Sequence, residues 1–174
     1  MPHPIFERWQ NANTMLDAEY EVIAMGEDAI PMLEDFFEGR IANDYGVPYR
    51  DLGLPYRCAL ETVSRLGLIA RSLEKYLIIG VREGHSIAAS ALGRLGQVGD
   101  TAVRTLADAL HQPNADRFDH DLATEAAASI IRLGAADHPS VQLAREASER
   151  SRTTWARTSA YVELEDRKRA ERLA

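Results

Sequence analysis

One short pattern recurs four times in this chain and constrains its fold more than any other feature. An alanine is followed four residues later by an aliphatic residue, three residues after that by Leu or Met, and at once by glycine. The glycines are 41, 29 and 38 residues apart, and self-similarity at such a period is typical of stacked repeats. The four copies are Ala18-Val22-Met25-Gly26, Ala59-Val63-Leu66-Gly67, Ala88-Leu92-Leu95-Gly96 and Ala126-Ile130-Leu133-Gly134.

The spacing within each copy predicts a helix and the place where it ends. Steps of four and three residues put the alanine, the aliphatic residue and the Leu or Met on one helical stripe. The alanine leaves room for a neighbouring helix to approach closely. The glycine stands where a helix C-terminus needs a left-handed backbone, so we expect the helix to stop there and the chain to turn.

A second apolar helix is predicted after each glycine. We expect Asp28, Asp100 and Asp137 to cap these second helices at their N-termini. Each repeat would then be a helical hairpin that cannot bury its apolar faces alone, so stacking of the hairpins would build the core. The apolar pairs that mark the second helices are Leu33-Phe37, Leu73-Leu77, Leu106-Leu110 and Leu143-Ala147.

Three copies share a longer motif in which arginine stands two residues before the glycine. With the amphipathic helix that follows each, these copies resemble HEAT-like repeats over roughly residues 14–148; the first copy departs most, because Ala24 replaces the arginine. The resemblance implies an all-α, right-handed α-solenoid of about four HEAT-like hairpins, and it says little about activity, because this family includes scaffolds, chromophore lyases, glycosylases and hydroxylases. The motifs are Val63-Ser64-Arg65-Leu66-Gly67, Leu92-Gly93-Arg94-Leu95-Gly96 and Ile130-Ile131-Arg132-Leu133-Gly134.

The chain is expected to be one domain spanning residues 1–174. A hydrophobic content of 45% in 174 residues suits a single core. We expect a break near residues 148–154, before a C-terminal helix at 150–174 that caps the end of the array. The four repeats are expected at about 14–38, 56–79, 86–111 and 121–149.

Two connections between repeats, at about 40–55 and 112–121, are unusually long. Both follow a second helix and precede the next first helix, so we expect them on one edge of the array, beside the face lined by the second helices. Long insertions on one edge often belong to a binding surface.

Composition bears on the compartment of the protein. There is no apolar run of 18 residues, and Glu7 and Arg8 lie close to the start, so we expect neither a membrane span nor a signal peptide. The single cysteine, Cys58, cannot form an internal disulfide and is expected to be buried. A reducing cytoplasm fits these features best.

The negative charge of the chain is concentrated near its start. The formal net charge is −7, and residues 1–50 alone hold ten acidic and three basic residues. On the second helix of repeat one, Glu27, Glu34 and Glu38 are spaced seven and four apart and share one side, flanked by Asp28 and Asp35. This acidic stripe is either a solvated helix face or a docking surface for a basic protein partner.

The connection at 40–55 contains residue types that dominate protein interfaces. Tyr45, Tyr49 and Arg50 would offer large contact areas at low entropic cost. The alternative is that the tyrosines pack over the edge of the array, and Tyr56 is expected to do so because it is in register with the core stripe.

The connection at 112–121 offers secondary contacts through Asp116, Phe118 and Asp119. Oxygen and nitrogen ligands gather there, with His120 and Asp121 beside them, yet no second cluster stands at a recognised metal spacing. Asp119 or Asp121 is better explained as a helix N-cap, so we expect no metal.

No motif in the chain points to catalysis. No His-Glu dipeptide occurs, although HEAT-like hydroxylases use such pairs to bind iron. A nucleophile elbow, a phosphate-cradling glycine loop, a Cys-x-x-Cys motif and paired catalytic carboxylates are also missing. We therefore expect neither an enzymatic activity nor a cofactor.

The repeated arginines Arg65, Arg94 and Arg132 should form a ladder along the array. They would bond carbonyls or acids of adjacent repeats, or else line a groove for an anion or a nucleic acid. A pI of about 5.2 disfavours phosphate backbones, so we expect no nucleic acid partner.

The leading prediction is a non-enzymatic protein-binding module, and most specifically a bacterial immunity protein that occludes a cognate toxin. A scaffold or adaptor, or an accessory protein resembling chromophore lyases, is the alternative, and an enzyme acting on nucleic acid serves only as a contrast. The predicted partner-binding residues are Glu34, Asp35, Glu38, Tyr45, Tyr49, Arg50, Asp116, Phe118 and Asp119.

Overall fold

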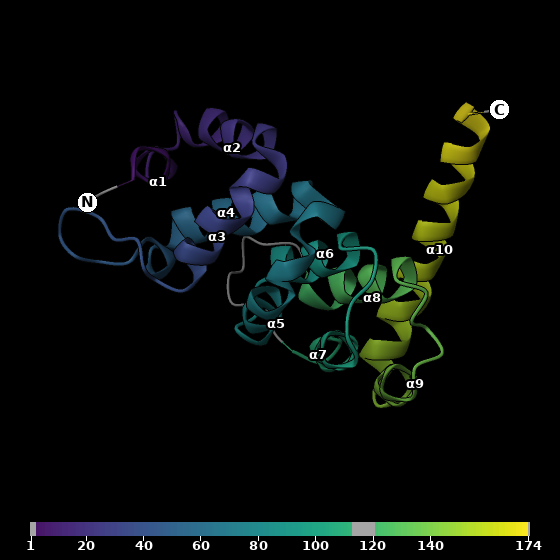
Figure 1. Ribbon diagram of the computed structural model, residues 1–174. Coiled ribbons are helices and arrows are strands. Elements are labelled where there is room, and N and C mark those ends of the chain that lie inside the picture. The colour runs from purple at the N-terminus through teal and green to yellow at the C-terminus, as the bar shows by residue number, and fades with distance from the viewer. Residues whose placement is uncertain (1–2, 113–120, 174) are drawn as a thin grey trace.

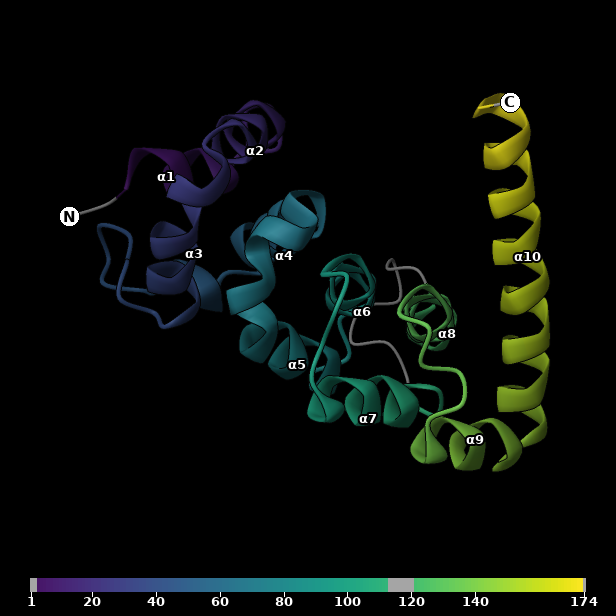
Figure 2. The same cartoon turned by 45° about the vertical axis from the view of Figure 1, so that its right-hand side comes forward.

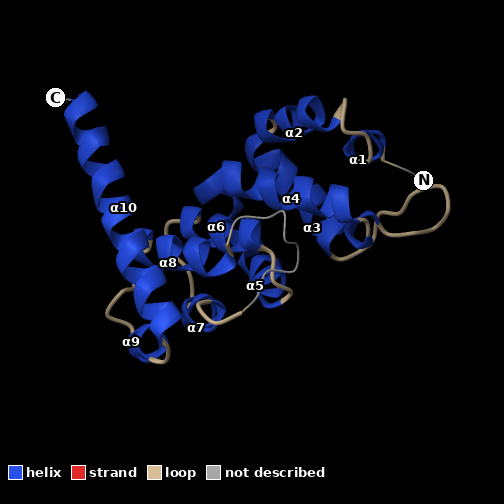
Figure 3. Ribbon diagram, turned by 180° about the vertical axis from the view of Figure 1, so that it is seen from behind, coloured by secondary structure: helices blue, strands red, loops and turns tan. Residues whose placement is uncertain are grey.

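The computed structural model describes residues 3–112 and 121–173, and all regular structure in them is helical. Within these ranges no strand forms, and the one β-bridge pairs Ala42 with Pro48 (Figure 3). The α-helices are α1 (Pro4–Trp9), α2 (Met15–Ala24), α3 (Ala29–Phe37), α4 (Gly53–Leu66), α5 (Glu74–Arg82), α6 (Ser86–Arg94), α7 (Asp100–Ala109), α8 (Leu122–Arg132), α9 (Pro139–Glu146) and α10 (Glu149–Leu173). Three 3-10 segments are η1 (Gly26–Asp28), η2 (Tyr49–Asp51) and η3 (Gly67–Leu73).

The helices lie in two rows. In the first row α2 packs on α4, α4 on α6 and α6 on α8, and α10 continues that row by packing on α8. The second helices follow alongside, with α5 on α7 and α7 on α9 (Figures 1 and 2). In Figure 2, α10 lies at the end of the molecule opposite α1 and α2, and its last turns extend beyond the other helices.

The recurring stripe lies in the core as predicted, except at the Leu or Met position, where Met25 is exposed and Leu133 is half-buried. The four alanines and the four aliphatic residues that follow them are fully buried. The four repeat glycines all have positive φ, between 56° and 77°, which a residue with a side chain rarely adopts. Each glycine therefore ends its helix in the way that the sequence pattern indicates.

At the N-terminal end, the core is made of aromatic side chains. Phe6 and Trp9 of α1 pack against Phe36 of α3, with ring centroids 5.1 and 5.7 Å away, and Phe6 lies 5.7 Å from Tyr49. All four rings are fully buried. These aromatic contacts fasten α1 and the long connection to the first hairpin.

The predicted caps of the second helices are wrong at all three positions. Asp28 has helical backbone angles, because η1 runs directly into α3, and its side chain makes no capping bond. Asp100 is already the first residue of α7, and α9 is capped by His138, whose Nδ1 accepts from the Ser140 N–H at 3.2 Å. Asp121 does cap α8, because its side chain accepts from the Thr124 N–H at 3.1 Å. The sequence had indicated Asp119 or Asp121 for this role.

The last hairpin differs from its predicted register. Leu143, expected in the core, is 74% exposed, while Val141 and Ala144 of α9 are buried. The cause is that α9 begins at Pro139 and presents the stripe Val141-Ala144 to its neighbours. The helices break at residues 147 and 148, at the start of the predicted range, and residues 149–154 are already part of α10; Ser148 Oγ accepts from the Ser151 N–H at 3.1 Å.

Two further sequence expectations concern the burial of the single cysteine and the absence of a membrane-spanning helix. Cys58 is buried on α4 as predicted, and burial, with the nearby Glu19 carboxylate, raises the pKa of its thiol to about 12. Among the described helices none combines the length and the apolar character that crossing a bilayer demands. Even α10, with 25 residues, is charged along most of its outer turns.

Candidate protein-binding surface

The acidic stripe lies on α3, opposite a buried face. Leu33, Phe36 and Phe37 point into the core, whereas Glu34 and Asp35 are half-buried and Glu38, at the C-terminal end, is exposed. Helical spacing alone produces this separation, because residues three and four apart share a face. The stripe is therefore open to a partner at Glu38 and partly covered at Glu34 and Asp35.

Basic side chains of the protein itself already neutralise part of the stripe. Arg40 pairs with Glu38, and its Nε donates to Asp35 Oδ1 at 2.7 Å. Lys75 Nζ lies 3.4 Å from Glu38 Oε1. Glu34 has no ion pair with any residue that the structure describes. Exposed pairs of this kind contribute about 0–1 kcal/mol each, so a partner could displace them at little cost.

The connection at 40–55 is an ordered loop with an exposed tip. Asn43 Oδ1 accepts from the backbone N–H groups of Tyr45 and Val47, at 3.0 and 3.1 Å. The tip is held in a tight turn by these bonds and by the bridge at its base. Tyr45 stands on this tip with 90% of its surface exposed.

Tyr49 lies inside the protein and not on the predicted surface. Its ring is fully buried, and its hydroxyl donates a hydrogen bond to the Glu7 carboxylate. Burial, followed by that bond, raises the pKa of Tyr49, so the hydroxyl remains a donor. Tyr49 thus packs inside the protein and fixes the loop, which agrees with the alternative that the tyrosines pack over the edge of the array. The prediction that Tyr49 contacts a partner is wrong.

Arg50 borders a cleft that the sequence did not reveal. Its Nη1 donates to the Phe37 carbonyl at 2.8 Å, and its Nε lies 3.5 Å from Asp51 Oδ1. The cleft, about 420 Å³ in volume, opens between α3, η2, α4 and α5. Its lining includes Phe37, Arg50, Asp51, Tyr56, Tyr76, Ile79, Glu83 and His85.

Stacked rings form one side of this cleft. Phe37 and Tyr76 lie parallel with centroids 5.1 Å apart, and Tyr56 meets Phe37 edge-on at 6.2 Å. Tyr56 also packs against His85 at 5.0 Å. The half-buried position of Tyr56 agrees with its predicted packing role.

Carboxylates stand around the mouth of the cleft. The Tyr76 hydroxyl donates to Glu38 Oε1 at 2.6 Å, and the Tyr56 hydroxyl lies 3.4 Å from Glu83 Oε2. Burial raises the pKa of Tyr56, and the neighbouring Glu83 charge adds to the shift. A cationic side chain entering the cleft would meet aromatic faces and carboxylate oxygens together.

The structure brings some predicted residues together and separates others. Glu38 and Arg50 border the same cleft, because Glu38 bonds Tyr76 and Arg50 bonds Phe37. Glu34 and Asp35 continue along α3, and Tyr45 stands on the loop tip. Asp116, Phe118 and Asp119 lie outside the described residues.

Sequence reasoning missed Tyr76, Ile79, Glu83 and His85. They belong to the second hairpin and its end, and nothing in local spacing connects them to residues of α3. Ile79 was the one available signal, because it is an aliphatic residue on the polar side of its helix, and it is 49% exposed.

Within residues 3–112 and 121–173, no three His, Cys, Asp or Glu side chains are placed to hold a metal ion. The predicted ladder of arginines also differs from expectation. Arg65 Nε donates to Glu61 of its own helix at 3.1 Å, and its guanidinium lies over the Tyr20 ring of α2, 5.3 Å from the ring centroid. The side chains of Arg94 and Arg132 form no ion pair or hydrogen bond with the described part of the chain, so the three arginines do not form a regular ladder.

A comparison with models of protein families found no matching family, and searches of curated proteins and of solved structures found no similar protein.

Proposed function

We propose that this chain is a non-enzymatic protein-binding module, built as a right-handed α-solenoid of about four HEAT-like hairpins with α10 as the capping helix. The two rows of helices and the left-handed glycine at the end of each first helix support that architecture. Its ligand would be a protein with a basic surface, docking on α3, the loop tip at Tyr45 and the aromatic cleft.

The observation that carries this proposal is the junction of the acidic stripe with the cleft. Glu38 ends the stripe and is bonded to Tyr76, whose ring stacks on Phe37 inside the cleft. A partner lysine or arginine could enter the cleft beside these rings while its neighbours pair with Glu34 and Asp35. Aromatic anchors beside complementary charge are the usual composition of interface hot spots.

The most specific form of the proposal is a cytoplasmic immunity protein that neutralises a cognate toxin. The mechanism would be occlusion: the acidic surface would cover the active cleft of a cationic toxin domain, and this chain would perform no chemistry. Complementary charge would also speed association, by about 10- to 1000-fold, which suits an inhibitor that must bind its toxin quickly.

A scaffold or chromophore-lyase-like accessory role is the second candidate, and α10 is the observation that favours it. The outer turns of α10 are exposed and stand away from the other helices (Figure 2). A helix in that position could join the protein to a larger assembly. A single basic partner recovered from the native host would favour the immunity role, and a set of enzymes or pigment proteins would favour the accessory role.

Charge reversal of the stripe tests the proposal. The partner that co-purifies from the native host is identified by mass spectrometry and titrated calorimetrically against the triple variant Glu34→Lys, Asp35→Lys and Glu38→Lys. We expect affinity to fall by about 100-fold or more, because attraction becomes repulsion at an interface.

The matched control reverses three exposed acids elsewhere, Asp17→Lys, Asp108→Lys and Glu146→Lys, with the same change in net charge. Affinity in this control should stay within a few-fold of wild type. If both triple variants bind alike, the stripe is not part of the interface. Circular dichroism of both variants verifies that the helices remain folded.

A further inference from the structure

The face formed by the first helices contains three neighbouring cavities, which share lining residues and are called the groove below. The first, about 400 Å³, lies over α2, α4 and α6, and the second, about 320 Å³, over α4, α6 and α8. Both are lined by Glu61 and Ile87. The third, about 410 Å³, lies between α8 and α10 and shares Arg132 and Tyr161 with the second. In Figure 2, the helices α2, α4, α6 and α8, which line these cavities, lie on the side away from α5, α7 and α9.

Two buried polar atoms along this groove have no partner. Glu19 lines the first cavity with 4% of its surface exposed, and its Oε2 accepts no hydrogen bond. Ser86 lines the second cavity with 1% exposed, and its Oγ is also unbonded. Buried polar groups without partners are rare in folded proteins, and each one needs an explanation. Groups on a ligand lying in the groove would supply the missing bonds.

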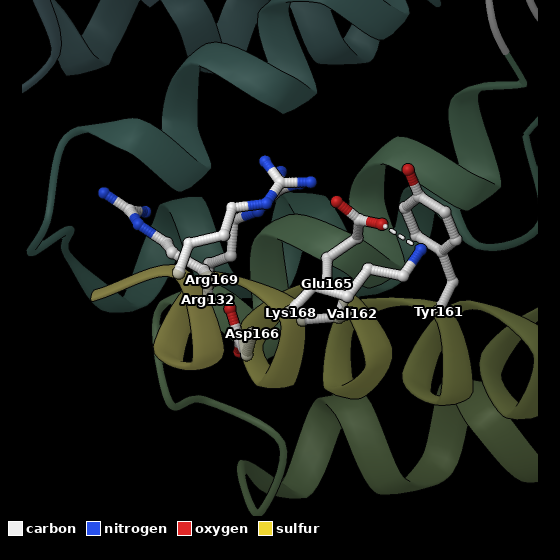
Figure 4. Close-up of a pocket in the computed structure, with 8 residues that line it drawn as sticks. Arg132, Tyr161, Val162, Glu165, Asp166, Lys168 and Arg169 are labelled. Carbon is white, nitrogen blue, oxygen red and sulfur yellow. Dashed lines mark hydrogen bonds and ion pairs between the residues drawn. The ribbon is translucent and has the colours of Figure 1, made fainter. Parts of the chain in front are cut away.

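The α10 end of the groove is rich in unpaired arginines. Arg132 of α8 and Arg169 of α10 extend to the same side of α10, although they come from different helices (Figure 4). Together with Arg172 they line the third cavity, and none of the three forms an ion pair within the part of the chain that is described. Lys168, by contrast, lies 3.5 Å from Glu165. Guanidinium groups are suited to bind carboxylates through two parallel hydrogen bonds.

The remaining lining distinguishes between anionic ligands. Four acidic side chains stand among the arginines, and they would repel the uniform charge of a nucleic acid backbone. Leu16 and Leu54 make the α2 end apolar. A ligand that fits must therefore have apolar side chains at one end and a few discrete carboxylates at the other. Those four acidic residues, Glu61, Glu125, Glu165 and Asp166, line the second and third cavities, and Glu19 is a fifth acidic residue in the first.

We infer that this groove is a second protein-binding site, and that it takes an extended acidic peptide segment of a partner protein. Apolar side chains of the segment lie against Leu16 and Leu54, its backbone bonds Glu19 and Ser86, and its carboxylates pair with Arg132, Arg169 and Arg172. The site has the opposite charge to the stripe on α3 and lies on a different face. It is independent of the proposed function.

Two octapeptides with blocked ends test the inference. Each contains two leucines followed or preceded by alternating serine and glutamate, so that the leucines stand at the N-terminus of one peptide and at the C-terminus of the other. A third peptide has lysine in place of glutamate, and a short DNA duplex completes the probes. Binding is measured by calorimetry at low salt. We expect saturable binding of at least one glutamate peptide and none of the lysine peptide. Tighter binding of the duplex than of either glutamate peptide would overturn the inference in favour of a nucleic acid site.

Matched arginine variants locate the site. The triple variant Arg132→Gln, Arg169→Gln and Arg172→Gln should bind the glutamate peptide about tenfold more weakly or worse, since it loses three charge-assisted contacts. The control triple, Arg71→Gln, Arg157→Gln and Arg167→Gln, removes the same charge from exposed positions outside the groove and should keep wild-type affinity. Equal weakening in both would reduce the effect to net charge and reject the site.

Ser86→Ala provides a readout that separates binding from folding. Because Ser86 Oγ is unbonded in the free protein, the variant should unfold at the wild-type temperature or above it. It should also bind the glutamate peptide a few-fold more weakly. Unchanged peptide affinity would mean that Ser86 does not contact the peptide. It would contradict the inference that the bound segment runs along the groove toward α2.

Discussion

The two ends of this protein are held together by different kinds of side chain. At the N-terminal end, four aromatic rings fill the space between α1, α3 and an irregular loop. Toward the C-terminal end, α6 and α8 meet through small residues: a Cβ on Gly93 would lie 2.8 Å from Ser129 Cα, and Ser129 Oγ donates to the Ala89 carbonyl at 2.7 Å. Large rings can fill irregular gaps, whereas small residues allow regular helices to approach closely.

The same two ends also differ in charge. Residues 1–50 carry a net charge as large as that of the whole chain, and the arginines of the groove's third cavity, which lack an ion pair among the described residues, lie around α10. An array of this kind can therefore offer surfaces of opposite sign without changing its architecture, because surface residues of a helix are free to vary while the buried stripe is kept.

Removal of one ring should have the largest effect on stability. Trp9→Ala leaves a cavity in the aromatic cluster and should lower the free energy of unfolding by about 3–5 kcal/mol, as measured by urea denaturation. Because contacts in stacked hairpins are mainly between neighbours, hydrogen exchange should accelerate first in α1 to α3. Uniform acceleration up to α8 would mean that the two ends unfold as a single unit.

Addition of one methyl group tests the other end. Gly93→Ala pushes α6 and α8 apart and should cost about 1–3 kcal/mol in thermal or urea unfolding. Gly53→Ala is the matched control, because nothing lies within 4 Å of its Cβ position, and alanine in a helix should stabilise by up to about 1 kcal/mol. Equal effects at both glycines would show that the close approach of α6 and α8 is not needed.

The smallest effect is expected from a buried acid at the N-terminal end. Burial raises the pKa of Glu19, so folding favours its protonated form, and that stabilisation is present below the unfolded pKa and lost as pH rises through the folded pKa. In the Glu19→Gln variant, the free energy of unfolding in urea should therefore depend less on pH above pH 4.5 than in the wild type. Relative to the wild type, the variant should gain stability as the pH approaches neutrality. A steeper pH dependence in the variant would contradict this.

Local predictions from the sequence succeeded where short spacing decides the structure. The glycine that ends each first helix, the buried stripe and the break before α10 all follow from residues within one or two helical turns. Asp100 and Asp137 missed the N-cap position by one residue, and Asp28 directly precedes α3 without a capping bond, since a capping side chain depends on where the preceding turn places the backbone. Leu143 failed for a related reason, because an apolar residue does not by itself reveal the start of its helix.

The candidate surfaces were predicted in part. Glu34, Asp35 and Glu38 share one side of α3 as their spacing indicates. Tyr49 and Tyr45 were indistinguishable in the sequence, and only the path of the loop places one in the core and the other on the tip. The groove has no linear motif, because Arg132 and Arg169 belong to helices that meet only when α10 packs on α8.

The sequence by itself determined an all-helical chain, the glycine turns and most of the residues that the first helices bury, because helix periodicity and backbone sterics act over a few residues. The tertiary structure alone decided which of the outward residues come together. Tyr76 reaches Glu38 across 38 residues, and Tyr49 reaches Glu7 across 42. Such contacts depend on how each hairpin is set against the next, and that geometry arises from the packing of whole helices and not from spacing along the chain.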